Sequence, residues 1–537
     1  MRSCLSRLTS VWTTVAVLNA GGALAQTSDT RLVTAVARQD SETARQLLDT
    51  NIDVNATRAD GATALLWTAH WNDVAMADRL IRAGANVNAA DDHGVTALER
   101  ACENGSLAMV TLLLAADADP NVARASGLTP LMTAARTGQV EVVRALLAAG
   151  ADVSAVTGET RSSALMWAVS ERHGDIAQLL LAHNANPQAS TATGFTPLMF
   201  AIGNGDLELI DTLIAAGVDV NQTGADGTHA LPYAIVSGQD RAALRLLDRG
   251  ADPNGTLGGV TALHAAAGDV ANWLGEWARR HGQERFSSVY GRSRLTPSRR
   301  LPLVNALLAR GADPNARITP WAMFMNYIGY PTKGAFEPFA CGTGDLRGAT
   351  PLWVAAYGSN GGASAQMGFG GLFSSQPVSG ADIIRALLAA GADQHLTTAD
   401  GTTPFMVAAG LGRATYTPRE PRALRAPSAE EAVAVLLEAG ANLNAVNEAD
   451  FTALHGAAMR GLNEVVEYLV AKGADINARD FRGRTAYRMA EGSKQSFQFQ
   501  SWPETAALLA SLGANTRLGI PGTVQERLRD ATRTDQD

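Results

Sequence analysis

The chain has 537 residues, a mean hydropathy of −0.02 and a formal net charge of −8 at pH 7. An acidic chain repels nucleic-acid phosphates, so we expect no nucleic-acid partner. Its three cysteines, Cys4, Cys102 and Cys341, are too few for a disulfide framework.

The first 25 residues have the pattern of a secretory signal peptide. Arg2 and Arg7 form a positive start, residues 8–18 form a short apolar run, and Ala23-Leu24-Ala25 is a small-residue cleavage site before Gln26. This apolar run has eleven residues, which is too short for a helix that spans a bilayer, since such a helix needs about 20 apolar residues. We expect a periplasmic or secreted product without a membrane span, and a bacterial envelope suits a large exported chain with so few cysteines.

A block of the form Gly-Ala-Asp/Asn-x-Asn recurs through the rest of the chain. Its central acid or amide falls at positions 53, 86, 119, 152, 186, 219, 252, 313, 393, 442, 475 and 515. The step is 33 or 34 residues except where it lengthens to 61, 80, 49 and 40. A fixed period of this length predicts a solenoid of stacked repeats.

Each repeat combines helix-start and helix-stop signals. In Thr129-Pro130-Leu131 the threonine is suited to cap a helix and the proline to its first turn. A second stretch, residues 140–147, has one apolar face at helical spacing, and Gly150 is suited to end it in a left-handed conformation. The unit is therefore predicted to be helix, turn, helix, glycine stop and extended turn.

This pattern resembles the ankyrin repeat, and the arrangement is similar to that of secreted bacterial ankyrin repeat domain-containing proteins. The resemblance covers about residues 30–517. It implies an all-α solenoid of about twelve helix-turn-helix repeats with β-turn fingers and a concave face, within an array that spans residues 26–517. Residues 518–537 are expected to be a polar tail. The resemblance also implies that binding residues lie on the finger tips and after the Ala-Ala pair of the first helix.

Four insertions interrupt the array, near residues 269–300, 316–347, 358–380 and 412–428. Fourteen of the 30 aromatic residues lie between 269 and 379. Aromatic residues are enriched where proteins recognise each other, so these rings are partner-binding candidates, although they could instead form a private core. The candidates are Trp321, Tyr327, Tyr330, Phe324, Trp273, Trp277 and Tyr357.

A second candidate surface lies near the N-terminus. His70 and Trp71 follow the small-residue pair of a predicted first helix, and His93 lies on the next finger. These three residues are expected to face the partner-binding groove. Trp67 and Trp167 are expected to pack between repeats.

The first insertion is also rich in arginine, which leaves two alternatives: an anion site or a solvated loop. The arginines are Arg279, Arg280, Arg285, Arg292, Arg294, Arg299 and Arg300.

No catalytic signature is present, and we expect no enzyme activity, cofactor or metal site. The chain has no His-Glu-x-x-His, Gly-x-Ser-x-Gly or Cys-x-x-Cys motif. Asp117-x-Asp119-x-Asn121 begins like a calcium loop, but Val122 and Leu128 stand where that loop needs glycine and glutamate. His264, His455 and Cys102 are expected to be structural.

Three functions remain open on the sequence. The first is a monomeric exported adaptor that binds a protein through its concave face, fingers and insertions. The second is a secreted effector directed at host proteins. The third is a small-molecule or weakly catalytic site in the insertions, which would need residues such as His395, Asp345 or Glu337 to converge.

Overall fold

A computed structural model describes most of the array, and its described residues form two compact units. The described residues are 29–281 without Ala225, Leu295, 297–319, 347–360, 380–412, Ala426, 428–481, 483–492 and 501–519. We call residues up to Ala125 the N-unit and those from Ser126 the C-unit.

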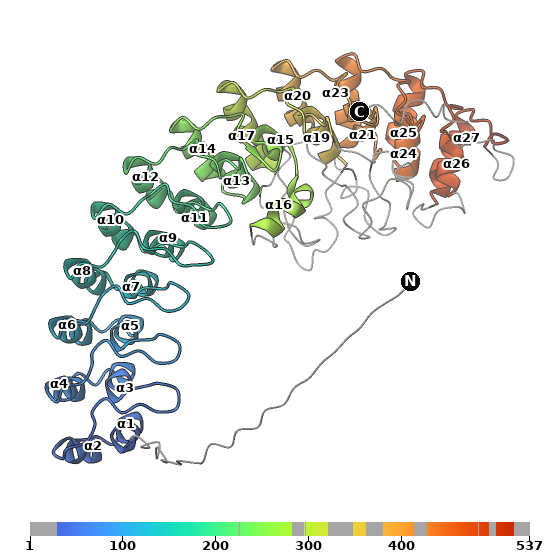
Figure 1. The fold of residues 1–537 in the computed structure, drawn as a ribbon. Coiled ribbons are helices and arrows are strands. Elements are labelled where there is room, and N and C mark those ends of the chain that lie inside the picture. The colour runs from blue at the N-terminus through green and yellow to red at the C-terminus, as the bar shows by residue number, and fades with distance from the viewer. Residues whose placement is uncertain are drawn as a thin grey trace, which may run out of the picture. The chain divides into compact units, whose positions relative to one another are not determined.

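The described N-unit consists of three helix pairs, in which a first, inner helix is followed by an outer helix (Figure 1). The pairs are α1 (Arg31–Ala37) with α2 (Ser41–Leu48), α3 (Ala64–Trp71) with α4 (Val74–Arg82), and α5 (Ala97–Glu103) with α6 (Leu107–Ala115). The inner helices pack against each other in one row, and α4 packs against α6 in the other. Helix α2 buries only Ala44, as expected of the terminal repeat of a solenoid.

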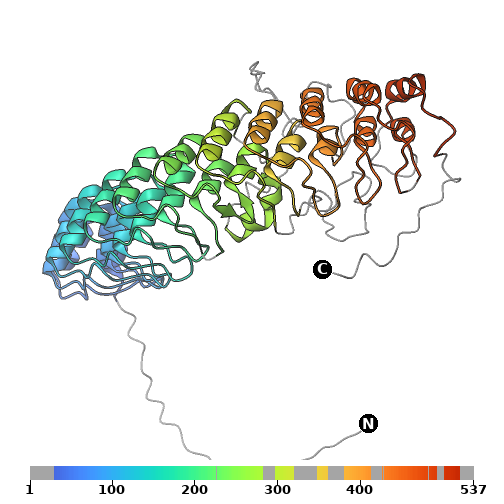
Figure 2. The ribbon, with the colours of Figure 1, turned by 90° about the horizontal axis from the view of Figure 1, so that it is seen from above.

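The C-unit continues the same plan, with successive helix pairs stacked side by side (Figure 2). The inner helices are α7 (Pro130–Thr137), α9 (Ala164–Ser170), α11 (Pro197–Asn204), α13 (Ala230–Val236), α15 (Ala262–Ala267), α19 (Pro351–Gly358), α21 (Pro404–Ala408), α24 (Ala453–Arg460) and α26 (Ala486–Glu491). The outer helices are α8 (Val140–Ala148), α10 (Gly174–Ala182), α12 (Leu207–Ala215), α14 (Asp240–Asp248), α17 (Pro297–Ala309), α20 (Gly380–Ala389), α23 (Ala429–Glu438), α25 (Asn463–Ala471) and α27 (Pro503–Ser511). The predicted all-α solenoid is confirmed.

The predicted start and stop signals operate in the structure. The hydroxyl of Thr129, the N-cap residue of α7, accepts a hydrogen bond from the backbone N–H of Met132 at 3.3 Å. Gly150, after α8, has a φ of 86°, a left-handed conformation that glycine adopts without a steric cost.

Where the repeated block ends in asparagine, hydrogen bonds of that residue join consecutive repeats in both units. In the N-unit, Asn55 Oδ1 accepts from Asn86 N at 2.7 Å. In the C-unit, Asn254 Oδ1 accepts from Asp313 N at 2.8 Å, although the first insertion separates the two residues in sequence. The last asparagine of the repeated block therefore forms a ladder that continues past an insertion.

The first insertion contains secondary structure that the sequence did not predict. It forms the 3-10 helix η1 (Ala271–Leu274) and the helix α16 (Gly275–Arg280), between α15 and α17. Before α15, strand β1 (Thr256–Leu257) pairs antiparallel with β2 (Val260–Thr261), with Thr256 opposite Thr261 and Leu257 opposite Val260. Among the described residues, no helix is long and apolar enough to cross a membrane.

Candidate partner-binding surface

Helix α3 carries an exposed cluster of rings on the N-unit, formed by Trp67, His70 and Trp71. The rings of Trp67 and Trp71 stack with centroids 6.1 Å apart, and the ring of His70 meets Trp71 edge-on at 4.6 Å. Trp71 retains 42% of its surface exposed, and His70 is also exposed. The guanidinium of Arg58 lies 5.5 Å from the Trp67 ring. The cluster therefore presents apolar area whose rings hold one another in place.

The end of α3 is fixed by the next repeat. The Asn104 side chain donates hydrogen bonds to the carbonyls of Ala69 and His70, at 2.9 and 3.0 Å. These bonds satisfy carbonyls that a helix end leaves without an intrahelical partner. His93 lies outside the ring cluster, exposed on the neighbouring finger, where its backbone N–H donates to Asp91 Oδ1 at 2.9 Å.

Helix α5, which packs against α3, carries an ion network that sequence analysis missed. Arg124 Nε is 2.5 Å from Glu99 Oε1, and Arg124 Nη2 is 2.6 Å from Glu103 Oε1. Burial raises the pKa of Glu99, and the Arg124 guanidinium opposes that shift. Glu99 follows the N-cap threonine by three residues, where no other described inner helix has an acidic residue, and this departure was the available signal.

Trp277, a second candidate, is buried. Only 5% of it is exposed, and its Nε1 donates to Thr228 Oγ1 at 2.8 Å. Its ring stacks on His281 with centroids 4.5 Å apart and lies 6.1 Å from Tyr233 and 6.4 Å from Phe195. Helix α16 therefore folds back over α13 and over Phe195, which lies just before the N-cap residue of α11. Trp277 belongs to the private-core alternative and not to a contact surface.

Two further candidates from the insertions also pack internally. Half-buried Trp273 lies 6.4 Å from the ring of Trp353 and 6.0 Å from that of Tyr357, which is 8% exposed. Trp353 and Tyr357 stack at 5.3 Å. The remaining candidates, Trp321, Phe324, Tyr327 and Tyr330, lie outside the described residues.

The described arginines of the first insertion are engaged within the chain. Arg279 and Arg280 pair with Glu276, and Arg299 Nε donates to Asp240 Oδ2 at 2.9 Å. Buried Arg300 donates to three carbonyls at the end of α15. These contacts speak against an anion site on the described arginines, and buried Arg300 also differs from the solvated-loop alternative.

The predicted structural histidines are confirmed as such. His264 and His455 are fully buried, and each forms a reciprocal capping box with the threonine that starts its helix. Burial lowers the pKa of His264 to about 4 and also lowers that of His455. Cys102 lies in the core, where burial raises the pKa of its thiol.

No group of three His, Cys, Asp or Glu side chains among the described residues is placed to hold a metal ion. His395 is exposed on the turn after α20, while Asp345 and Glu337 lie outside the described residues.

Comparison with known proteins agrees with the repeat architecture. The family model for ankyrin repeats (three copies) matches residues 32–124, 117–191, 165–257, 198–283 and 375–480. Because these matches cover more than half of the chain, it belongs to the ankyrin repeat family. Ankyrin repeats are protein–protein interaction modules, and proteins built from them are generally non-catalytic scaffolds.

The individual relatives match only parts of this chain. Human ankyrin repeat and SOCS box protein 16 is 31% identical over 138 residues, or 25% of this chain and 27% of that protein. BRCA1-associated RING domain protein 1 of Caenorhabditis elegans is 45% identical over 65 residues, or 12% of this chain and 9% of that protein. The matches thus cover 27% of the length of the first of these curated relatives and 9% of the second.

Solved ankyrin repeat domains are similar over a limited part of the array. The human ASB11 ankyrin repeat domain is 27% identical, with a TM-score of 0.36, and the match covers 40% of this chain and 96% of that one. An ankyrin repeat domain from Acinetobacter baumannii is 32% identical, with a TM-score of 0.34, and covers 35% and 99%.

Proposed function

We propose that this chain is an exported, non-catalytic adaptor that binds a protein partner through the ring cluster of α3. The observation that carries the proposal is Trp71, which remains 42% exposed while its neighbours hold its ring in place. A rigid exposed tryptophan contributes large contact area at a small entropy cost, and tryptophan is enriched among the residues that dominate binding energy.

A second contact region is proposed in the insertion at 316–347, on Trp321, Tyr327 and Tyr330. Their clustering in sequence supports this part of the proposal. A long insertion costs little free energy, about 0.6 kcal/mol per doubling of a loop, so it can persist because it binds.

Two sets of alanine substitutions test which surface binds. The first set changes His70, Trp71 and His93, and the second changes Trp321, Tyr327 and Tyr330. A partner captured by the mature chain from its own envelope fraction is titrated against both sets by calorimetry. We expect the first set to lose about 2 kcal/mol of binding free energy or more with an unchanged melting temperature.

A matched control changes Arg136 and Thr137 to alanine, because they occupy the same positions on α7 that His70 and Trp71 occupy on α3. It should bind normally. If the first set binds normally while the second folds and loses binding, the α3 surface is the wrong site.

Export is the other part of the proposal, supported by the charge and apolar pattern of the first 25 residues. N-terminal sequencing of the protein from the envelope fraction should give Gln26. An intact Met1 on a cytoplasmic product would refute export and leave the adaptor function standing.

A further inference from the structure

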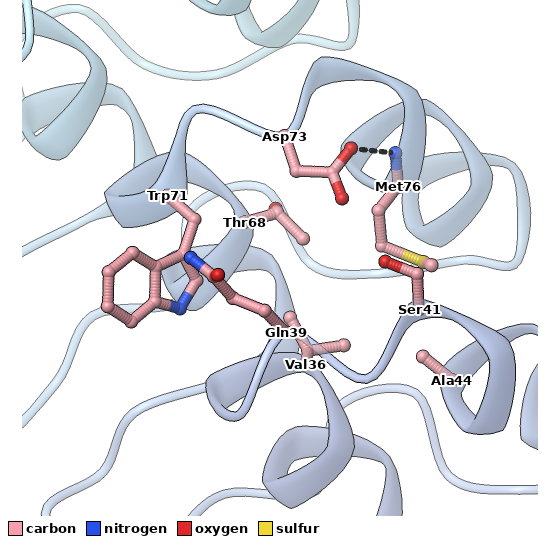
Figure 3. A pocket seen from close by; sticks show the side chains of 8 residues that line it. All are labelled: Val36, Gln39, Ser41, Ala44, Thr68, Trp71, Asp73 and Met76. Atoms are coloured by element: carbon pink, nitrogen blue, oxygen red, sulfur yellow. Dashed lines mark hydrogen bonds between the residues drawn. The ribbon is translucent and has the colours of Figure 1, made fainter.

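A cavity of about 290 Å³ opens in the N-unit where the α1–α2 turn meets α3 and α4 (Figure 3). Its floor is apolar, and its rim carries oxygen atoms and the ring of Trp71. No lysine, arginine or histidine lines it. The lining residues are Val36, Gln39, Ser41, Ala44, Thr68, Trp71, Asp73 and Met76.

At three turn glycines of the C-unit, Gly138, Gly205 and Gly461, the corresponding place is filled by a side chain from the following repeat. His173, the N-cap residue of α10, lies so close to the turn glycine Gly138 that a Cβ there would be 2.6 Å from the imidazole ring. In each case a nitrogen of the filling side chain reaches the carbonyl two residues before the left-handed turn residue. These contacts are His173 Nε2 to Arg136 O at 3.1 Å, Gln239 Nε2 to Gly203 O at 3.3 Å and Trp502 Nε1 to Met459 O at 2.9 Å.

The first repeat departs from this arrangement at both positions. Gln39, with a φ of 60°, takes the place of the turn glycine, and Asp73 takes the place of His173. Asp73 cannot donate from its carboxylate, and its Oδ1 already accepts from Met76 N at 2.9 Å. Within the described N-unit, the carbonyl of Ala37, the counterpart of Arg136 O, accepts no hydrogen bond. The slot is therefore open, and it presents acceptors where these three repeats supply a donor.

We propose that this slot binds the guanidinium group of an arginine side chain on the protein partner. The Asp73 carboxylate supplies the opposite charge, and the exposed face of Trp71 suits a planar cation. Val36, Ala44 and Met76 provide an apolar floor for the methylene stem. The surroundings favour a cation, since residues 29–125 contain 14 acidic and 8 basic side chains, a net charge of −6.

The arginine's origin in a partner rests on the proposed adaptor function, but its binding can be measured without the partner. The full chain is labelled with ¹⁵N-tryptophan, and the Trp71 indole signal is assigned with Trp71→Phe. The probe is N-acetyl-arginine methylamide, and the control ligand is the citrulline analogue, which replaces the guanidinium with a neutral urea of similar shape. We expect saturable Trp71 shifts in the millimolar range with the arginine probe and at least fivefold weaker binding of the citrulline analogue.

Two substitutions at one position give the matched test. Asp73→Asn keeps a good N-cap residue but removes the charge, and should weaken arginine binding at least fivefold. Asp73→His places in the slot the residue that fills it after Gly138, and should abolish binding. Asp206→Asn changes the N-cap aspartate of α12, whose carboxylate accepts from Leu209 N at 3.0 Å, and should have no effect.

Equal binding of the two ligands, or unchanged binding in folded Asp73→Asn, would overturn the cation site. So would the absence of any Trp71 shift with the arginine probe. Such results would leave the adaptor function intact, because the alanine sets test that function separately against the captured partner.

Discussion

The inner helices α3 and α13 both carry large rings, and they differ in what covers those rings. Trp67 on α3 and Tyr233 on α13 hold the same repeat position, four residues after the N-cap residue. Trp67 adjoins the exposed Trp71, whereas Tyr233 is only 4% exposed because Trp277 of α16 packs near it. The same repeat position therefore carries a half-buried ring beside an exposed one in the N-unit and a buried ring in the C-unit, where the insertion covers it.

The largest expected effect comes from removing Trp277, the ring that covers Tyr233. Trp277→Ala deletes a buried ring and the hydrogen bond to Thr228, so it should destabilise the C-unit by about 3 kcal/mol or more. Urea unfolding measures the loss, and limited proteolysis should show faster cleavage within residues 269–281. Trp71→Ala, the matched change on the open surface, should stay within about 0.5 kcal/mol of the parent. Equal stability of the two variants would mean that α16 does not cover the rings.

Acid should lower the free energy of unfolding of the C-unit more than that of the N-unit. Burial lowers the pKa of His264 to about 4, below its ordinary 6.5, so the unfolded chain binds a proton that the folded chain excludes. Stability should therefore fall as the pH drops from 6.5 towards 4, by about 1.4 kcal/mol per pH unit from this residue. The N-unit histidines, His70 and His93, are exposed. Burial raises the pKa of Glu99, so that residue's contribution is present at low pH and is lost as the pH rises.

Hydrogen exchange at pH 7 and pH 4.5, followed by mass spectrometry, separates the two units. Protection of α15 should fall at the lower pH more than protection of α3. In His264→Gln the pH dependence of α15 should flatten. An equal loss of protection in both units would contradict this assignment.

A buried arginine is expected to hold the outer helix α17 against the end of α15. Arg300 Nη1 donates to Ala265 O at 2.8 Å and Gly268 O at 2.7 Å. Arg300→Met keeps much of the volume but leaves these carbonyls without that donor, so it should cost about 2 kcal/mol. Arg299→Ala removes a more exposed pair with Asp240 and should cost less than about 1 kcal/mol. Thermal unfolding compares the two, and a reversed order would show that Arg300 does not clamp the insertion.

The smallest effects should come from the asparagine ladder. Asn88→Ala in the N-unit and Asn254→Ala beside the first insertion each remove one link between repeats. Each side chain makes two exposed hydrogen bonds to the next repeat, so each substitution should cost about 1 kcal/mol, or about 0.5 kcal/mol for each bond. Urea unfolding of both variants tests whether an insertion weakens its link, and a much smaller cost for Asn254→Ala would show that it does.

The repeats and the exposure of Trp71 could be predicted because both depend on local patterns. A threonine, a small-residue pair and a glycine at fixed spacing fix each helix pair, so Trp71 falls at a position that no neighbour in the unit covers. The fate of Trp277 could not be predicted this way. Its burial depends on a long-range contact with Phe195 and Tyr233, and no periodicity encodes such a contact.

The slot beside Trp71 was missed for a different reason. Its signal is a difference at single positions: Asp73 where another repeat has His173, and Gln39 where that repeat has Gly138. Such a difference acquires meaning only after the structure shows that His173 fills the slot in its own repeat.

The ladder has a consequence for how such a chain can change over time. Asn315 Oδ1 accepts from Asp393 N at 2.7 Å although 78 residues separate the two. The hydrogen bond between neighbouring repeats thus depends on their contact in space and not on the length of chain between them. An insertion at a turn can therefore arise in one genetic event and come under selection while the hydrogen bonds between neighbouring repeats are kept. The same turns are suitable insertion sites for grafting a foreign loop onto this protein.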